Sequence, residues 1–166
     1  MSEEKSGSRW LEKSFIATLI CFPNKFEQVQ SIVKDSTYLQ SQDCAEIYSS
    51  VVELYRQGKS IDRAVVADHL SQKGKDRLAE NLSWMIYENM AEGWHLLEYA
   101  NQIADHHYRR KIAEKVKQMN PFDTGKYPYS RDIISELQHI ADSFQGCFTE
   151  EDTLNDIVDR RCHFLN

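Results

Sequence analysis

Two glycines, Gly58 and Gly74, end two short helical segments, and this division constrains the fold more than any other feature of the sequence. Asp43 and Glu46 predict where the first helix starts, because carboxylates accept hydrogen bonds from the unpaired amides of a first turn. Ser60 or Asp62 can cap the second helix. Apolar residues of the first segment recur at the three- and four-residue steps of a mostly buried helix: Ile47, Tyr48, Val51, Val52, Leu54 and Tyr55. Two helices joined by a tight turn therefore lie at the centre of an expected all-α fold.

The flanking sequence predicts further helices around this pair. Residues 1–8 are polar and predict a flexible arm, with Ser8 as the N-cap of the next helix. Pro23 ends that helix and starts a short one, while Tyr38 and Leu39 anchor the following loop on the core. A later helix carries a stripe of Leu78, Leu82, Met85 and Ile86, to which Trp84 can belong, and Gly93 is a break before the next helix. Residues 9–93 therefore predict a compact multi-helix head.

The longest periodic segment runs over residues 94–119, and about 1.5 Å per residue makes it longer than a compact head needs. Residues 120–129, with two prolines and Gly125, predict a tip, after which Ser130 caps a returning helix. Residues 94–146 thus predict a protruding antiparallel helical hairpin. Residues 147–166 predict a linker-like tail with a possible helix, whose apolar face consists of Leu154, Ile157, Val158 and Leu165.

The order and spacing of these segments resemble the N-terminal domain of the DnaB-type bacterial replicative helicase. Glu12–Pro23 is similar to the opening helix of that family, and Tyr99–Val116 is similar to the first arm of its long hairpin. Ala17 stands where the family usually has glycine, and the loops after Gly74 lack its glycine pair and proline. The central stretch carries the resemblance through Ile47, Leu54, Gly58, Ile61, Asp62, Val65, Leu70 and Gly74.

The resemblance implies a non-catalytic assembly domain. In such helicases these domains pair through their hairpins into a collar on a hexameric motor and bind primase, within the primosome, whereas a separate domain hydrolyses ATP. The expected partners are a second copy, as a dimer or higher oligomer, and a primase or helicase loader. Two alternatives remain open: a free-standing helical regulator of helicase or primase, and a small helical protein that binds nucleic acid.

Charge argues against direct contact with DNA. The chain has a formal net charge of −6, whereas a phosphate backbone needs a basic field. The one basic concentration lies between Tyr108 and Lys117, and we expect it to be a solvated helix face or a contact for a protein partner. There is no apolar run long enough to span a membrane and no secretory leader, so the cytoplasm is the expected location.

No catalytic, cofactor or metal site is expected from the motifs. Gly58-Lys59-Ser60 is similar to the end of a phosphate-binding loop, but Glu53 occupies the position of the first glycine and a helix leads in. Adjacent pairs such as His106-His107 and Cys162-His163 point in different directions on a helix, which is unsuitable for zinc. Asp68-His69 and Asp105-His106 fail as catalytic dyads for the same reason. The four cysteines lie far apart and predict free thiols.

The predicted sites are therefore surfaces for other proteins. Self-association is assigned to apolar residues of the hairpin: Leu97, Ile103, Ile112, Val116, Ile134 and Leu137. Contact with a primase or loader is assigned to Tyr108, Arg109, Arg110 and Lys115. Enzymatic activity is not expected of this chain, because no convergent set of polar side chains is found.

Overall fold

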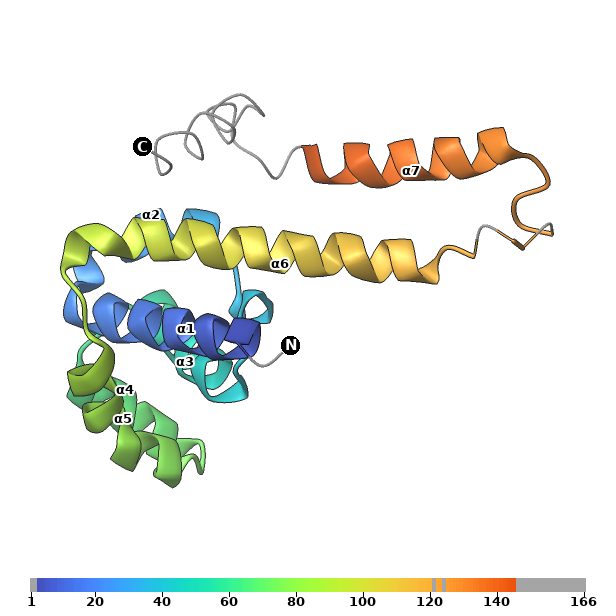
Figure 1. The fold of residues 1–166 in the computed structure, drawn as a ribbon. Coiled ribbons are helices and arrows are strands. Elements are labelled where there is room, and N and C mark those ends of the chain that lie inside the picture. The colour runs from blue at the N-terminus through green and yellow to red at the C-terminus, as the bar shows by residue number, and fades with distance from the viewer. Residues whose placement is uncertain (1–2, 121, 124, 146–166) are drawn as a thin grey trace. The chain divides into compact units, whose positions relative to one another are not determined.

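The structure, a computed structural model, describes residues 3–120, 122, 123 and 125–145. These residues form α-helices and short 3-10 helices without a β-strand, which confirms the predicted all-α class (Figure 1). The elements are, in order, α1 (Glu3–Cys21), η1 (Pro23–Lys25), α2 (Phe26–Ile32), η2 (Ser36–Tyr38), α3 (Gln42–Arg56), α4 (Arg63–Gln72), α5 (Asp76–Asn89), η3 (Gly93–His95), α6 (Leu96–Gln118) and α7 (Ser130–Gln145).

The chain forms two compact units that divide after His107, inside α6. We call the described residues up to His107 the head and those from Tyr108 the arm unit. The sequence predicted a division near residue 93. The boundary is later because the first turns of α6 supply core residues of the head, namely Leu96, Tyr99, Ala100, Ile103 and Ala104, all of which are buried.

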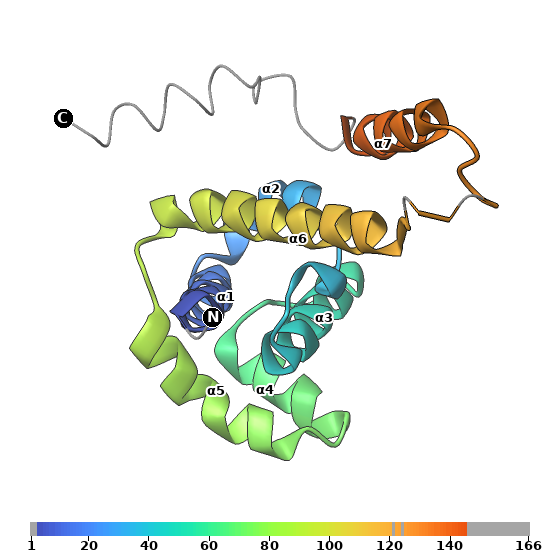
Figure 2. The ribbon, with the colours of Figure 1, turned by 45° about the vertical axis from the view of Figure 1, so that its right-hand side comes forward.

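Helix α1 is a central element of the head, and α3 and α5 both pack against it (Figure 2). Phe15, Ile16 and Leu19 have no exposed surface, and Ala17 is equally buried at the position where the family usually has glycine. The helix begins at Glu3, so Ser8 lies inside it and the predicted N-cap at Ser8 is wrong. The predicted flexibility of residues 1–8 stays a prediction.

Helix α3 begins earlier than predicted, and a residue of α1 completes its N-terminus. The N-cap is Ser41, whose hydroxyl accepts a hydrogen bond from the Cys44 amide, so Asp43 lies within the first turn. The backbone N–H groups of Gln40 and Ser41 donate to the two carboxylate oxygens of buried Glu12, each across 2.8 Å. In a local capping box a residue of the helix itself would accept from the N-cap amide. Here a side chain from another helix has that role.

The two glycines end α3 and α4 as predicted. Gly58 has φ +67° and Gly74 has φ +71°, the left-handed conformation that favours glycine. After each glycine the next amide bonds back to the helix, from Lys59 to the Leu54 carbonyl and from Lys75 to the Leu70 carbonyl. At the start of α4, the Asp62 carboxylate accepts from the amides of Ala64 and Val65. Of the two predicted caps, Asp62 is therefore the one used.

Long-range contacts also position the connections of the head. Tyr38 and Leu39 are buried, as predicted, and the Tyr38 ring stacks on His107 with centroids 4.1 Å apart. His107 is buried and its Nδ1 donates to the Thr37 carbonyl across 3.1 Å. A Cβ at Gly93 would lie 2.8 Å from the Phe22 ring. Gly93 is thus needed for a close approach, beyond its predicted role as a helix break.

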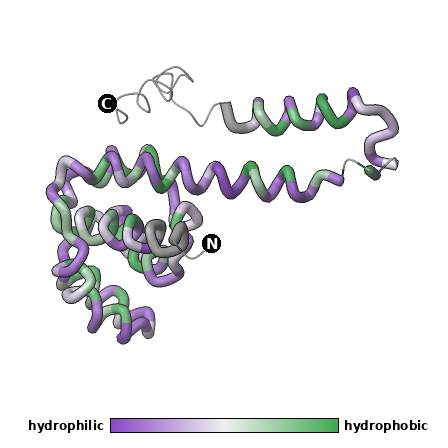
Figure 3. Tube along the Cα trace, in the orientation of Figure 1, coloured by the Kyte–Doolittle hydropathy of each residue, from purple (hydrophilic) through white to green (hydrophobic). Residues whose placement is uncertain are grey.

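The arm unit contains the second half of α6, a turn and α7. The distal half of α6 is mostly hydrophilic, whereas apolar residues recur along α7 (Figure 3). Lys115 Nζ donates to Ser143 Oγ across 3.2 Å, which joins the two helices. Around the turn, the Asp123 carboxylate accepts from the amides of Gly125 and Lys126. Helix α7 begins at Ser130 itself, so the predicted cap at that residue is wrong; the Tyr129 amide just before the helix donates to the Asp132 carboxylate across 2.9 Å. Full antiparallel packing of a protruding hairpin stays a prediction.

Candidate interaction surfaces

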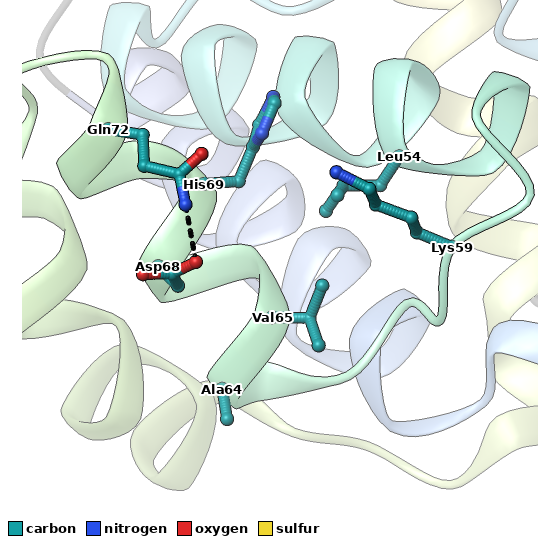
Figure 4. A pocket seen from close by; sticks show the side chains of 7 residues that line it. All are labelled: Leu54, Lys59, Ala64, Val65, Asp68, His69 and Gln72. Carbon is teal, nitrogen blue, oxygen red and sulfur yellow. Dashed lines mark hydrogen bonds between the residues drawn. The ribbon is translucent and has the colours of Figure 1, made fainter.

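A pocket of about 410 Å³ lies beside the turn at Gly58, between the end of α3 and helix α4. Figure 4 shows its lining: Leu54, Lys59, Ala64, Val65, Asp68, His69 and Gln72. Asp68 accepts a hydrogen bond from the Gln72 side chain across 2.6 Å. The lining thus combines apolar side chains with an amine from Lys59 and an imidazole from His69.

His69 pairs with Glu53 of α3, across the turn, and not with the adjacent Asp68. Its Nε2 lies 3.2 Å from Glu53 Oε2, while Lys73 Nζ lies 2.6 Å from Oε1 of the same carboxylate. The hydrogen bond from Lys73 lowers the pKa of Glu53 below its ordinary value, and the bond from His69 adds to that effect. The three side chains therefore form a polar contact that links α3 and α4.

The structure describes two of the four cysteines, Cys21 and Cys44, and they differ in exposure. Cys44 is buried, and burial raises its thiol pKa to about 11, which keeps it protonated and unreactive. Cys21 is a free exposed thiol. Within the part of the chain that the structure describes, no three His, Cys, Asp or Glu side chains are placed to hold a metal ion. None of the described helices is long and apolar enough to cross a membrane.

A second depression of about 240 Å³ lies in the head between α1, α3 and α5. Ile47, Leu78, Leu82 and Met85 contribute apolar surface, and Trp84 and Glu88 also line it. Trp84 is 61% exposed and so does not belong to the buried stripe of α5, where the sequence allowed it. Leu82 and Ile86 are the buried residues of that stripe.

The residues predicted for self-association fall into three environments. Ile103 is buried in the head, so we exclude it from the exposed surface. Leu97, also in the head, and Ile112 are half-buried. Val116, Ile134 and Leu137 of the arm unit are 45%, 57% and 44% exposed. The structure therefore brings the last three to the surface of one unit.

The residues predicted for a partner contact follow one another along the second half of α6. Arg109 and Lys115 are exposed, and Tyr108 and Arg110 are half-buried. Close by, Lys111 pairs with Glu114 across 3.5 Å, a spacing of one helical turn. Cations thus recur along the arm unit, within a chain of net negative charge. The four residues predicted for the tail helix, Leu154, Ile157, Val158 and Leu165, lie outside the described residues.

Comparison with protein families matches residues 5–105 to the DnaB-like helicase N terminal domain. The match covers more than half of the chain. The chain belongs to this family. The family links the DnaB-like domain to helicases and DNA replication, as the sequence predicted. A comparison with curated proteins finds no match to the chain.

The matched residues of the DnaB-like domain coincide closely with the head. They contain Glu12, the α3–α4 pair and both depressions, and they end at residue 105, just before the boundary at His107. The residues of the arm unit lie beyond the match. Two features of the domain were missed from the sequence: the Glu12 contact and an exposed aromatic pair of α5, Trp84 and Tyr87, whose ring centroids lie 5.7 Å apart. Glu12 stands at a position of α1 where the helical spacing predicts an apolar residue, and this could have indicated its contact from the sequence.

Proposed function

We propose that this DnaB-like domain is a non-catalytic assembly and interaction module of a replicative DNA helicase. The arm unit associates with a second copy, and its basic side chains dock a primase or helicase loader. The tail at residues 147–166 serves as a linker. Family membership supports the helicase context. The observation that carries the assembly role is the set of exposed apolar side chains on the arm unit.

That set consists of Val116 on α6 and of Ile134 and Leu137 on α7. The two α7 residues are three positions apart and lie on one face of the helix. Burying a fully exposed aliphatic side chain contributes about 1.5–3 kcal/mol, and these three are about half exposed, so a second copy that covers them gains about half of that amount for each. A contact that leaves water over these side chains would give no such gain, because their apolar surface would stay hydrated.

The proposal is tested by placing charge on this surface. Val116→Asp combined with Leu137→Asp should weaken self-association by about tenfold or more, because each carboxylate loses hydration in the interface. Sedimentation equilibrium measures the change, and circular dichroism checks that the helices remain. Gln118→Asp with Ser135→Asp is the matched control, since it adds the same charge at exposed polar positions. An unaltered mass in the Val116 and Leu137 variant would contradict the proposal.

The docking role is tested by reversing the basic side chains. Arg109→Glu, Arg110→Glu and Lys115→Glu together should weaken binding of the purified primase or loader of the same cell by at least about tenfold, because the attraction to an acidic partner becomes repulsion. Lys34→Glu, Lys59→Glu and Arg63→Glu together, at exposed positions of the head, serve as the charge control. Titration calorimetry reads the affinity, and sedimentation checks that self-association persists. Equal binding by both variants would place the contact elsewhere.

A further inference from the structure

The outward face of α5 carries an aromatic pair that the head leaves uncovered. Trp84 is 61% exposed and Tyr87 is 79% exposed, and their ring centroids lie 5.7 Å apart. The two residues are three positions apart, so they occupy one face of the helix. Met90, just after α5, is 55% exposed. Soluble proteins rarely leave neighbouring large apolar side chains uncovered unless the surface binds something.

Carboxylates surround this pair. Glu80 and Glu88 lie four residues before and after Trp84, on the same face, and both are exposed. Neither forms an ion pair with another residue in the described part of the head. Residues 76–98 contain Asp76, Glu80, Glu88, Glu92 and Glu98 against the single cation Arg77, a formal charge of 1 − 5 = −4. Arg77 itself lies 3.7 Å from Asp43, an acidic residue of α3.

The depression between α1, α3 and α5 adjoins the aromatic pair, because Trp84 and Glu88 line it as well. Its volume of about 240 Å³ suits one or two aliphatic side chains at its apolar end, where Leu78, Leu82 and Met85 lie. Lys13 and Arg77 line the other end together with Asp43, so the cations of a partner are expected at the Glu80 and Glu88 side of the recess. The surface thus combines a partly apolar recess, two exposed aromatic rings and two carboxylates without an ion pair in the described head. We call Glu80, Trp84, Tyr87 and Glu88 the α5 surface.

We propose that the α5 surface binds a basic amphipathic helix of a protein partner. Aliphatic side chains of that helix enter the recess, while its lysine or arginine side chains lie over Trp84 and Tyr87 and pair with Glu80 and Glu88. Nucleic acid is disfavoured, since its phosphates would meet carboxylates. This surface is distinct from the basic residues of the arm unit and takes a partner of the opposite charge.

A single-tryptophan variant provides the reporter. The chain has three tryptophans, and Trp10→Phe with Trp94→Phe leaves Trp84 alone. The probe is a synthetic helical peptide of about 15 residues of Leu, Ala and Lys, and the matched peptide has Glu in place of Lys. The Lys peptide should shift the Trp84 emission to shorter wavelength and perturb the backbone amides of residues 80–90. The Glu peptide should do neither.

Matched variants separate specific docking from general attraction. The double variant Glu80→Lys with Glu88→Lys should weaken binding of the Lys peptide by about tenfold or more. Tyr87→Ala, made separately, should have an effect of the same size, as expected for an aromatic and ionic binding centre. Glu114→Lys with Glu136→Lys makes the same charge change on the arm unit and should leave the affinity within about twofold. Because all these side chains are exposed or half-buried, folding should persist.

Several outcomes would overturn the proposal. They are absence of a Trp84 response to the Lys peptide, equal binding of the Glu peptide, unchanged affinity after the Glu80 and Glu88 reversal, and amide perturbations confined to the arm unit. A Trp84 shift that depends on protein concentration without peptide would show that a second copy covers this surface. None of these outcomes bears on self-association through Val116 and Leu137, so the two proposals fail independently.

Discussion

The head and the arm unit contain equally regular helices, yet they bury their apolar residues to different extents. In the head, α1, α3 and the first turns of α6 enclose fully buried side chains such as Phe15, Tyr48 and Leu54. Among the described side chains of the arm unit, only Tyr127 and Ile140 are buried. Helix α7 has a clear apolar face, but Ile134 and Leu137 on that helix are about half exposed. An amphipathic pattern therefore predicts a helix without specifying what covers it.

Truncating the head core should give the largest effect. Phe15→Ala should lower the free energy of unfolding by about 3–5 kcal/mol, because the cavity left by a fully buried ring cannot collapse completely. All three tryptophans lie in the head, so urea denaturation followed by their fluorescence reports this unit.

Two control variants sharpen the comparison between the units. Phe122→Ala, at a side chain that is 89% exposed, should change the stability of the head by less than about 0.5 kcal/mol. Ile140→Ala should leave the fluorescence transition unchanged, since Ile140 belongs to the arm unit. A loss equal to that of Phe15→Ala would mean that the two units unfold as one.

Removing the Glu12 charge should have an intermediate effect. Glu12→Gln replaces a carboxylate that accepts two amide hydrogen bonds by a group with a single accepting oxygen, so about 1.5–3 kcal/mol of stability should be lost. Glu80→Gln is the matched control at an exposed position of the head and should be nearly neutral. If both substitutions have the same small effect on stability, the long-range contact of Glu12 does not contribute to the difference between the head and the arm unit.

The smallest effect should come from the polar contact between α3 and α4. The pKa of Glu53 is lowered in the folded head, so its contribution to stability is present above the ordinary value of 4.5 and is lost as pH falls through the lowered folded pKa. Lys73→Met should return the Glu53 pKa toward 4.5 and flatten this acid dependence. Because the carboxylate is largely solvated, we expect only a few tenths of a kcal/mol.

A carboxyl NMR titration of Glu53 measures that shift directly. Lys59→Met changes a lysine in the same turn that does not pair with Glu53, and it should leave the Glu53 pKa lowered. An unchanged Glu53 titration in Lys73→Met would show that His69 alone accounts for the depression.

Local patterns in the sequence were sufficient for much of the fold. Gly58 and Gly74 marked helix ends because a left-handed residue has a strong local preference. Asp62 was among the predicted caps for a similar reason. Asp43 was wrong as a helix start, since Ser41 lies two residues earlier and Glu12 completes its hydrogen bonding from a distant helix. Local capping patterns alone do not predict a contact with a residue of another helix.

The site features that escaped prediction depend on tertiary geometry. Glu53 and His69 meet only because the Gly58 turn folds α4 back onto α3. The close approach of Gly93 and Phe22 joins residues far apart in the chain. Trp84 lies two positions from both Leu82 and Ile86, so it points away from the buried stripe of α5, and helical spacing alone could have placed it on the outward face.

The Glu12 contact has a consequence for how relatives of this chain diverge. Glu12 substitutes for the residue that would normally close a capping box in the first turn of α3, where Cys44 stands. A descendant that acquires Glu or Gln at position 44 can close the box at the Ser41 amide locally, so position 12 then serves only the Gln40 amide, for which one accepting oxygen is enough. We expect acidic residues at positions 12 and 44 to exclude one another among homologues, a correlated substitution that an alignment of the family can reveal.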